Sequence, residues 1–399
     1  EEGKVLGDRQ VRWLARLPRT IAMPAFRELV VALVRDPATR SPAVIELLGP
    51  YVGDREVEDL LRRTLVEEVD ALVGEPRYFE RLTPDGRAAA LVRALHRTRG
   101  ADAVPLVAGA LHRAMGPMNG DVARGDARPQ LPKTAVGLLG LTDAGRAVLQ
   151  GMLGDDVPRR VRFEAGLQLA PSASGDPLLA GQVGARLLAD LDGVDGTLRM
   201  RGLGALGALA PAPDPSVDAR LGQLTRGAGA DQAERLAAAS ALGQRGVQAP
   251  LVEALRRPLV AEDLDLLDVE VAAAAARALG GIDDRSGGLE AARSLLATHR
   301  EVDAKLEIAS DDTTEGEALV ELRGALITAL CAGMGRRADA ASSAASLSDG
   351  ERDEVHAALV RRPLERGAMD VAARFGGEDL GDARFRWRAE LEACLLYTS

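Results

Sequence analysis

Residues 161–170 read VRFEAGLQLA, and segments of the same pattern recur along the chain. The clearest relatives are LRMRGLGALG (198–207), ERLAAASALG (234–243), VAAAAARALG (271–280) and LRGALITALC (322–331), and weaker copies are RAAALVRALH (87–96) and LPKTAVGLLG (131–140). The leucines at the ninth place, Leu169, Leu206, Leu242 and Leu279, follow one another at intervals of 37, 36 and 37 residues. A period of this length indicates an array of structural repeats.

Each segment has the spacing of a helix. Its first, fifth and ninth places are mostly apolar or small, and at about 100° per residue they lie on one face. A second apolar stretch, 147–153, precedes the first segment, and the polar turn 154–158 joins the two. The predicted unit is a pair of antiparallel helices, which must stack on its neighbours to bury its apolar faces. A low aromatic content, 3%, fits closely packed helices better than sheets.

This pattern resembles the HEAT family, most of all the bacterial HEAT repeats of the phycobilin lyase (PBS lyase-like) type. The family pattern is Leu-Leu, a turn Asp, then Val-Arg-x-x-Ala-x-x-Ala-Leu-Gly, and it is matched by Leu149, Leu153, Asp155, Val161, Arg162, Ala165 and Leu169. The match covers 145–281 and 318–331 and is weak over 1–140. It implies an all-α protein, a right-handed α-solenoid (α-α superhelix) of stacked antiparallel helix pairs. Such a fold says little about function.

The repeat pattern also predicts how the chain is divided into regions. Residues 1–140 are expected to be degenerate helical repeats or an N-terminal cap, and 141–335 the solenoid, with an acidic insertion near 301–317. Residues 348–393 are expected to form a C-terminal helical cap, and 394–399 to be a non-native tail. Loops are predicted at 116–130 and 336–347, and a helix start at Thr83-Pro84.

Composition narrows the function classes. The net charge of −10 argues against a phosphate-binding surface, so nucleic acid is not expected as a partner. No apolar run is long enough to span a membrane. The chain opens on Glu1, so its native start is expected to be missing or cleaved; a cytoplasmic location is predicted, with export left open.

No catalytic, cofactor or metal site is predicted. The two cysteines, Cys331 and Cys394, cannot form a disulfide framework or a zinc cluster. The four histidines show no metal-ligand spacing and are read as isolated surface or helix-end residues: His96, His112, His299 and His356. The acidic stretch 262–268 lacks the glycine and terminal glutamate of a calcium loop and is read as a solvated turn.

Four arginines share the second place of the pattern: Arg162, Arg199, Arg235 and Arg323. One hypothesis is a basic stripe that holds anions. The favoured interpretation is a structural ladder in which turn aspartates and these arginines bridge adjacent repeats. Asp195, Asp231 and Asp268 recur at one position before the helical segments, and the first two lie one helical turn before an arginine, where they are placed to pair with it.

The third place of the pattern lies about 160° from the core face. It holds Phe163, Met200 and Leu236 in three successive copies. If exposed, these residues would form an apolar ridge that marks a partner site. In that case Phe163→Asp is expected to abolish partner binding and leave helicity intact. Packing between repeats is the favoured alternative.

The sequence therefore predicts a non-enzymatic scaffold or adaptor that binds a protein or peptide, with a basic partner suggested by the net charge. The alternative is a bilin-lyase-like enzyme or chromophore-binding protein, for which the low aromatic content is unfavourable. A third interpretation is a HEAT-type DNA-binding protein. Trp13 and Trp387 stand near opposite ends of the chain and do not supply the aromatic-lined basic face that such binding needs.

Overall fold

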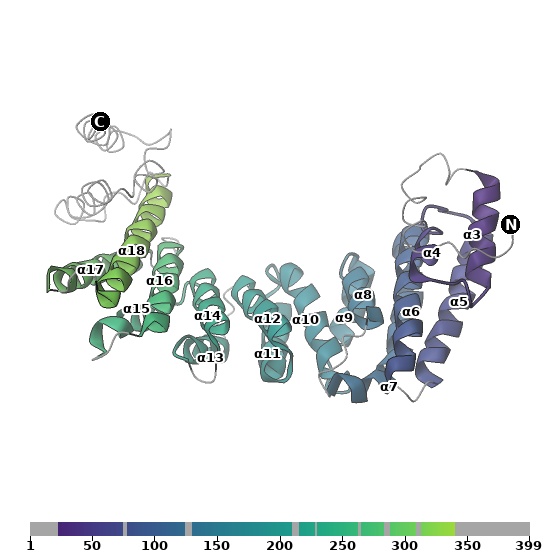
Figure 1. The fold of residues 1–399 in the computed structure, drawn as a ribbon, viewed down its shortest axis with the longest axis horizontal. Coiled ribbons are helices and arrows are strands. Elements are labelled where there is room, and N and C mark those ends of the chain that lie inside the picture. Colours follow the sequence, from purple (N-terminus) through teal and green to yellow (C-terminus); the bar gives the residue numbers. More distant parts are fainter. Residues whose placement is uncertain are drawn as a thin grey trace. The chain divides into compact units, whose positions relative to one another are not determined.

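The computed structural model describes residues 23–74, 78–123, 130–209, 215–227, 230–261, 265–282, 288–308 and 313–339. Every regular element in these ranges is a helix (Figure 1), which confirms the all-α class. The predicted C-terminal cap at 348–393 and the last six residues lie outside them, as do His356 and Cys394. Contacts divide the chain after Leu198 into two compact units, which are described separately below as unit 1 (residues 1–198) and unit 2 (residues 199–399).

Unit 1 is a succession of helices in which near neighbours along the chain pack together, such as α5 on α6, α6 on α8 and α10 on α11. The elements are α3 (Pro24–Arg35), α4 (Pro42–Glu46), α5 (Arg55–Gly74), α6 (Tyr78–Arg99), η1 (Gly100–Ala103), α7 (Val104–Ala123), α8 (Gln130–Leu139), α9 (Asp143–Gly151), α10 (Arg159–Ala173), α11 (Pro177–Asp190) and η2 (Leu191–Gly193). The predicted pair around the turn 154–158 corresponds to α9 and α10.

Unit 2 has two rows of helices. From α13 to α16 each helix packs on the next along the chain and also on the next but one, as α14 does on α15 and α16. The elements are α12 (Gly196–Ala208, which begins at the end of unit 1), α13 (Pro215–Thr225), α14 (Gln232–Gln244), α15 (Ala249–Val260), α16 (Leu266–Gly280), α17 (Gly288–Ile308) and α18 (Thr314–Asp339). One row therefore holds α13, α15 and α17, and the other holds α14, α16 and α18.

Short polar signals start these helices. Asp231 and Glu234 form a capping box at the beginning of α14, each side chain accepting from the other residue's backbone N–H. Asp176 caps α11, which has proline at its start, where a missing N–H costs no helical hydrogen bond. Inside the helices, small residues at the fifth place of the pattern are fully buried, among them Ala165, Ala238 and Ala275.

A recurring glycine at the tenth place sets the register between successive second helices of the predicted pairs. A Cβ added at this glycine would approach the eighth-place residue of the next copy, and the distances to the nearest Cβ or backbone atom there are 3.2, 2.8, 2.7 and 2.5 Å. The four contacts are Gly140 on Gln168 in unit 1, and Gly207 on Ala241, Gly243 on Ala278 and Gly280 on Ala329 in unit 2. A repeated place in the sequence thus makes the same contact each time.

Three expectations are corrected. Within the acidic stretch 301–317 the described residues are mostly helical, because α17 continues to Ile308 and α18 begins at Thr314. The end of α17 buries Val302 and Leu306, spaced by one turn, and exposes Glu307 to solvent. The predicted loop at 116–130 is helical as far as Ala123, and the helix expected to start at Thr83-Pro84 begins at Tyr78, with Pro84 inside it.

We expect Gly243→Ala to destabilise the protein. The new methyl carbon would lie 2.7 Å from the Cβ and 2.9 Å from the Cα of Ala278, so backbone would have to move. Overpacking of this kind costs about 1–3 kcal/mol, which urea unfolding would measure. Gly204→Ala is the matched control: nothing lies within 4 Å of the added carbon, so it should stabilise by roughly 0.5–1 kcal/mol. Equal effects of the two substitutions would contradict the register.

Candidate functional site

The ladder arginines are the most strongly organised group among the predicted site residues. Arg162 on α10 binds Asp190 at the end of α11 through two hydrogen bonds of 2.6 and 2.7 Å. The Asp190 side chain is only 3% exposed. The same guanidinium donates to the backbone oxygen of Gly154, 3.2 Å away, just beyond the end of α9. Hydrogen bonding to Asp190 raises the pKa of Arg162 and so keeps it charged.

The next two arginines, in unit 2, pair with acids on the following second helix. Arg199 on α12 lies 2.6 Å from Glu234 on α14. Arg235 on α14 pairs with Asp268 on α16 and also donates to the backbone oxygen of Thr225, the last residue of α13. These ion pairs connect one second helix to the next, and both acids are buried.

Three of the predicted ladder residues make other contacts: Arg323, Asp195 and Asp231. Arg323 on α18 lies 3.7 Å from Asp303 on α17, within one helix pair. Asp195 accepts from the backbone N–H of Leu198 at 3.1 Å, and Asp231 is the cap of α14. Capping uses these two aspartates because the first N–H groups of a helix have no partner in the helix. Of the aspartates predicted for the ladder, the structure places Asp268 against a ladder arginine, Arg235.

A common contact extends beyond the ladder. Buried or half-buried arginines donate to carbonyl oxygens at the C-terminal end of a neighbouring helix, where carbonyls lack helical partners, and also pair with an acid elsewhere. A buried example besides Arg162 and Arg235 is Arg245, which bonds Leu206 O and Asp218. The exposed Arg257 makes the same kind of contact, with Arg226 O and Asp268. A planar guanidinium has five N–H donors and can serve both partners, which a lysine ammonium cannot do with the same geometry.

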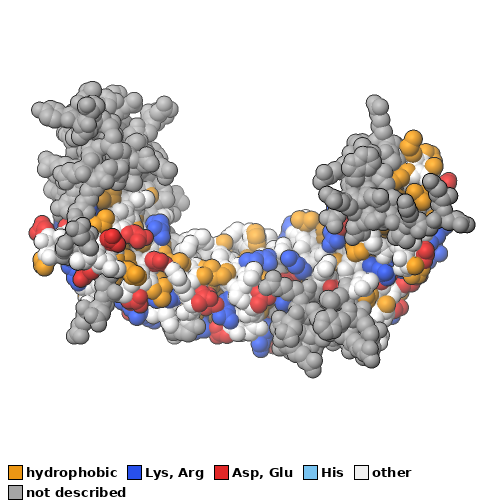
Figure 2. Space-filling model, viewed as in Figure 1, with side chains coloured by type: hydrophobic (Ala, Val, Ile, Leu, Met, Phe, Trp, Pro, Cys, Tyr) orange, Lys and Arg blue, Asp and Glu red, His pale blue; other side chains and the backbone are white. Residues whose placement is uncertain are grey.

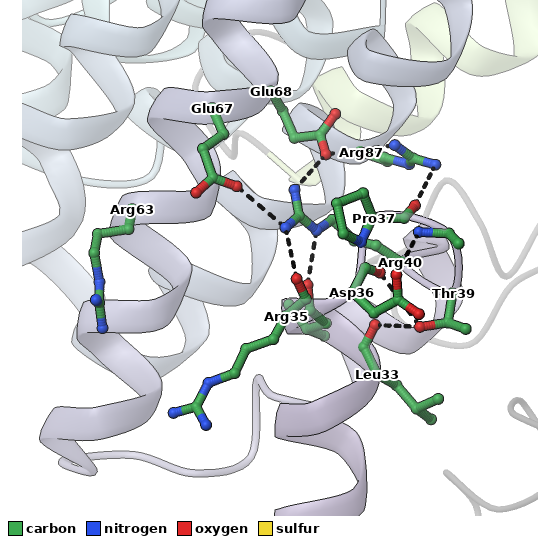
Figure 3. Close-up of polar contacts among 12 residues, drawn as sticks. Leu33, Arg35, Asp36, Pro37, Thr39, Arg40, Arg63, Glu67, Glu68 and Arg87 are labelled. Atoms are coloured by element: carbon green, nitrogen blue, oxygen red, sulfur yellow. Dashed lines mark hydrogen bonds and ion pairs between the residues drawn. The ribbon is translucent and has the colours of Figure 1, made fainter.

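The densest example lies in unit 1, around Arg40 (Figure 3). This side chain is 5% exposed and donates to Val34 O at 2.7 Å and Arg35 O at 3.4 Å, at the end of α3. On its other side it pairs with Glu68 at 2.8 Å and with Glu67 at 3.1 Å, both on α5. The Arg40 cluster, as we call these contacts, therefore closes α3 and ties it to α5.

Arg87 from α6 completes the Arg40 cluster. Its guanidinium lies 3.5 Å from Glu68 and donates to Pro37 O at 3.2 Å (Figure 3). The buried carboxylate of Glu68 therefore faces two cations, so its charge is compensated. Arrangements of this kind fix helices relative to one another. Their arginines are already occupied by acids and carbonyls, which disfavours the hypothesis of an anion-holding basic stripe.

The predicted ridge is not a continuous exposed surface. Phe163 is 1% exposed and lies in the core of unit 1, so it cannot meet a partner from solution. Met200 and Leu236 are half-buried. The geometry of a helix explains the difference: a helix packed on both neighbours and on its own pair buries more than one side, so the third place falls partly inside. Phe163→Asp would therefore damage the fold and cannot serve as a surface variant.

The histidines also need a correction. His299 is not at the surface: it is 4% exposed on α17, with Nδ1 3.3 Å from the carboxylate of Asp303 one turn later. His112 is exposed and His96 half-buried. Within the described ranges no group of three or more His, Cys, Asp or Glu is arranged to hold a metal ion.

Sequence reasoning missed several of these residues. No repeated motif marks three of the ion-pairing residues in the sequence: Asp190, Glu234 and Arg40. Asp190 ends α11, and only the packing of α11 on α10 brings it to an arginine 28 residues earlier. Glu234, which begins its ten-residue segment, could have been found from the capping-box spacing after Asp231.

No protein-family model matches the chain, and no curated protein matches it. None of the helices in the described part is both long enough and apolar enough to cross a membrane.

We expect Arg40→Leu to lower the free energy of unfolding by about 3 kcal/mol, because it leaves Glu68 buried with only the more distant Arg87 and removes the donors to α3. Chemical denaturation would measure the change. Arg35→Leu is the control: the Arg35–Glu56 pair is about half exposed, and removing it should cost less than about 1 kcal/mol. A loss for Arg40→Leu as small as the control's would show that the cluster does not hold α3.

Acid should weaken the contact between α3 and α5. Asp54 accepts from Arg27 at 2.6 and 2.9 Å and from the backbone N–H of Val57, and these hydrogen bonds, the one from Arg27 above all, lower the pKa of Asp54 below its ordinary 3.8 despite partial burial. A carboxyl whose pKa is lower in the folded state gives stability that is present above its unfolded pKa and is lost as pH falls through its folded pKa.

The stability difference between the wild type and Asp54→Asn should therefore be largest near neutral pH and shrink below about pH 4, as urea unfolding across pH would show. A difference that is independent of pH would mean that the charge on Asp54 contributes nothing.

Proposed function

We propose that this chain is a non-enzymatic protein–protein interaction scaffold, built as a right-handed α-solenoid of HEAT-like helix pairs. The proposed pairs are α9 with α10 in unit 1, and α13 with α14, α15 with α16 and α17 with α18 in unit 2. The predicted boundaries, with a helical N-terminal region to residue 140 and the solenoid body from 141 to 335, belong to the same proposal.

The observation that carries the proposal is the constant contact between the tenth-place glycine of one copy and the eighth-place residue of the next. Helix pairs that meet their neighbours at equivalent places generate an extended array, and extended arrays offer long surfaces to partners. The ion pairs from Arg199 to Glu234 and from Arg235 to Asp268 support the same arrangement. The charged side chains in these contacts hold helices together, and this is consistent with a rigid scaffold.

Affinity capture tests the proposal. The full chain, tagged at either end, is immobilised and exposed to a lysate of its source organism. A scaffold should retain a protein in near-stoichiometric amount, and nuclease treatment should leave that amount unchanged. The control is a Gly243→Leu chain whose packing is disrupted, which should retain none.

Two outcomes would count against the proposal. Retention of nucleic acid, or of no macromolecule with either tag, would contradict a protein-binding scaffold. A new visible absorbance band on mixing the pure chain with a bilin would favour the chromophore-handling alternative.

A further inference from the structure

One edge of unit 2 exposes large apolar side chains. Val260, at the end of α15, is 75% exposed; Leu266, at the start of α16, is 53% exposed; and Ile308, at the end of α17, is 89% exposed. Single exposed apolar residues are ordinary, but a group of them at one edge indicates a contact surface. Together with Glu307, Glu315 and Glu317 we call these residues the turn edge.

The helix arrangement brings these residues to the same edge. Few residues separate α15 from α16 and α17 from α18 in sequence, and the two helices of each pair pack on one another. Arg256 on α15 meets Glu301 on α17 at 2.8 Å, so the two helices run side by side there. Val260 lies one turn beyond this contact and Ile308 about two turns beyond it, in the same direction along the chain.

The second row of helices starts at this edge. Gly280 on α16 packs on Ala329 on α18, each about fifteen residues from the start of its helix. The first turns of the two helices are therefore at the same level. Leu266 stands in the first turn of α16, and Glu315 and Glu317 stand in the first turn of α18.

Acidic residues surround the apolar ones. Glu307, Glu315 and Glu317 are exposed, and no ion pair joins them to other described residues. In sequence, the stretches between these helices add Glu262, Asp263, Asp265, Asp311 and Asp312. The nearest cations along the chain are Arg257, which is paired with Asp268, and Lys305. Of the acidic residues, Asp265 is used to cap α16. Figure 2 shows acidic, basic and hydrophobic side chains mixed over the described part of unit 2, at the left.

We propose that the turn edge binds a basic amphipathic segment of a protein partner. Apolar side chains of that segment contact Val260, Leu266 and Ile308, and its Lys or Arg side chains pair with the surrounding glutamates. Charge complementarity selects this occupant, because a second copy of the chain, a nucleic acid or an acidic peptide would bring negative charge against negative charge. The inference rests on the proposed scaffold function and assigns it a partner class.

Synthetic peptides test the inference on the full chain. The probe is a fluorescent amphipathic peptide of about fourteen residues made of Leu and Lys at helical spacing, and its counterpart replaces every Lys by Glu. Binding is measured by fluorescence anisotropy at several salt concentrations. The Leu/Lys peptide should bind, less tightly as salt increases, and the Leu/Glu peptide should not.

Two double variants separate the apolar and charged contributions. Val260→Ser with Ile308→Ser, and Glu315→Gln with Glu317→Gln, should each weaken binding of the Leu/Lys peptide at least about tenfold. The glutamine variant should also reduce the dependence on salt. All four positions are exposed, so circular dichroism should show an unchanged fold. The matched controls are Leu178→Ser, 81% exposed in unit 1, and Glu290→Gln, exposed at the other end of α17.

The inference is overturned by no binding of the Leu/Lys peptide, by equal binding of the Leu/Glu peptide, or by control variants that weaken binding as much as the edge variants do. It is also overturned if the serine variant binds like wild type, because binding would then depend on charge alone. Repeating the lysate capture with the serine variant separates the two proposals. If both forms retain a partner, the scaffold proposal is supported and the turn edge is not its binding site. If the wild type retains no partner, the scaffold proposal itself is contradicted.

Discussion

Within each unit the structure depends on arginine side chains that form hydrogen bonds or ion pairs with two helices at once. The last carbonyls of a helix have no partner in that helix, and a carboxylate that is buried between helices needs a cation. A guanidinium meets both requirements with one side chain, as Arg40 does between α3 and α5 and Arg235 does between α13 and α16. Removing such a residue takes a donor from a helix end and a cation from a buried carboxylate, so each arginine contributes more than one ordinary ion pair.

Apolar packing is the second constraint. It depends on positions that have no side chain, where two helices can approach closely. The tenth-place glycines allow close approach of the neighbouring helix, and alanines fill most of the facing positions. Each small residue that is buried contributes less hydrophobic free energy than a large one. A core of small residues therefore depends on contact along the whole length of its helices. This explains how a chain with 3% aromatic residues can still be tightly packed.

The periodic part of this architecture was accessible from the sequence. Helix class, the pair α9–α10 and the small buried fifth places follow from residue spacing, because one buried side of a helix imposes a period on the chain. The continuation of α17 to Ile308 was not accessible, since residues 301–308 are acidic enough to resemble a loop and, among them, only Val302 and Leu306 are buried. Ladder arginines could be picked out by position, but Asp190 could not, because partners contributed by another helix depend on packing. The burial of Phe163 was the favoured interpretation but was not decided by the sequence for the same reason: burial on several sides leaves no simple pattern.

The Gly280–Ala329 contact also bears on how such a chain can change during evolution. The ninth-place leucines Leu279 and Leu330 are 51 residues apart, compared with 37 for the preceding interval, and yet the contact between the two helices is the same as between their predecessors. The additional residues lengthen α17 and α18 toward one edge and leave the glycine contact in place. We therefore expect insertions and deletions to be tolerated on that edge of unit 2 and excluded near the glycines, so that related chains differ in length mainly there.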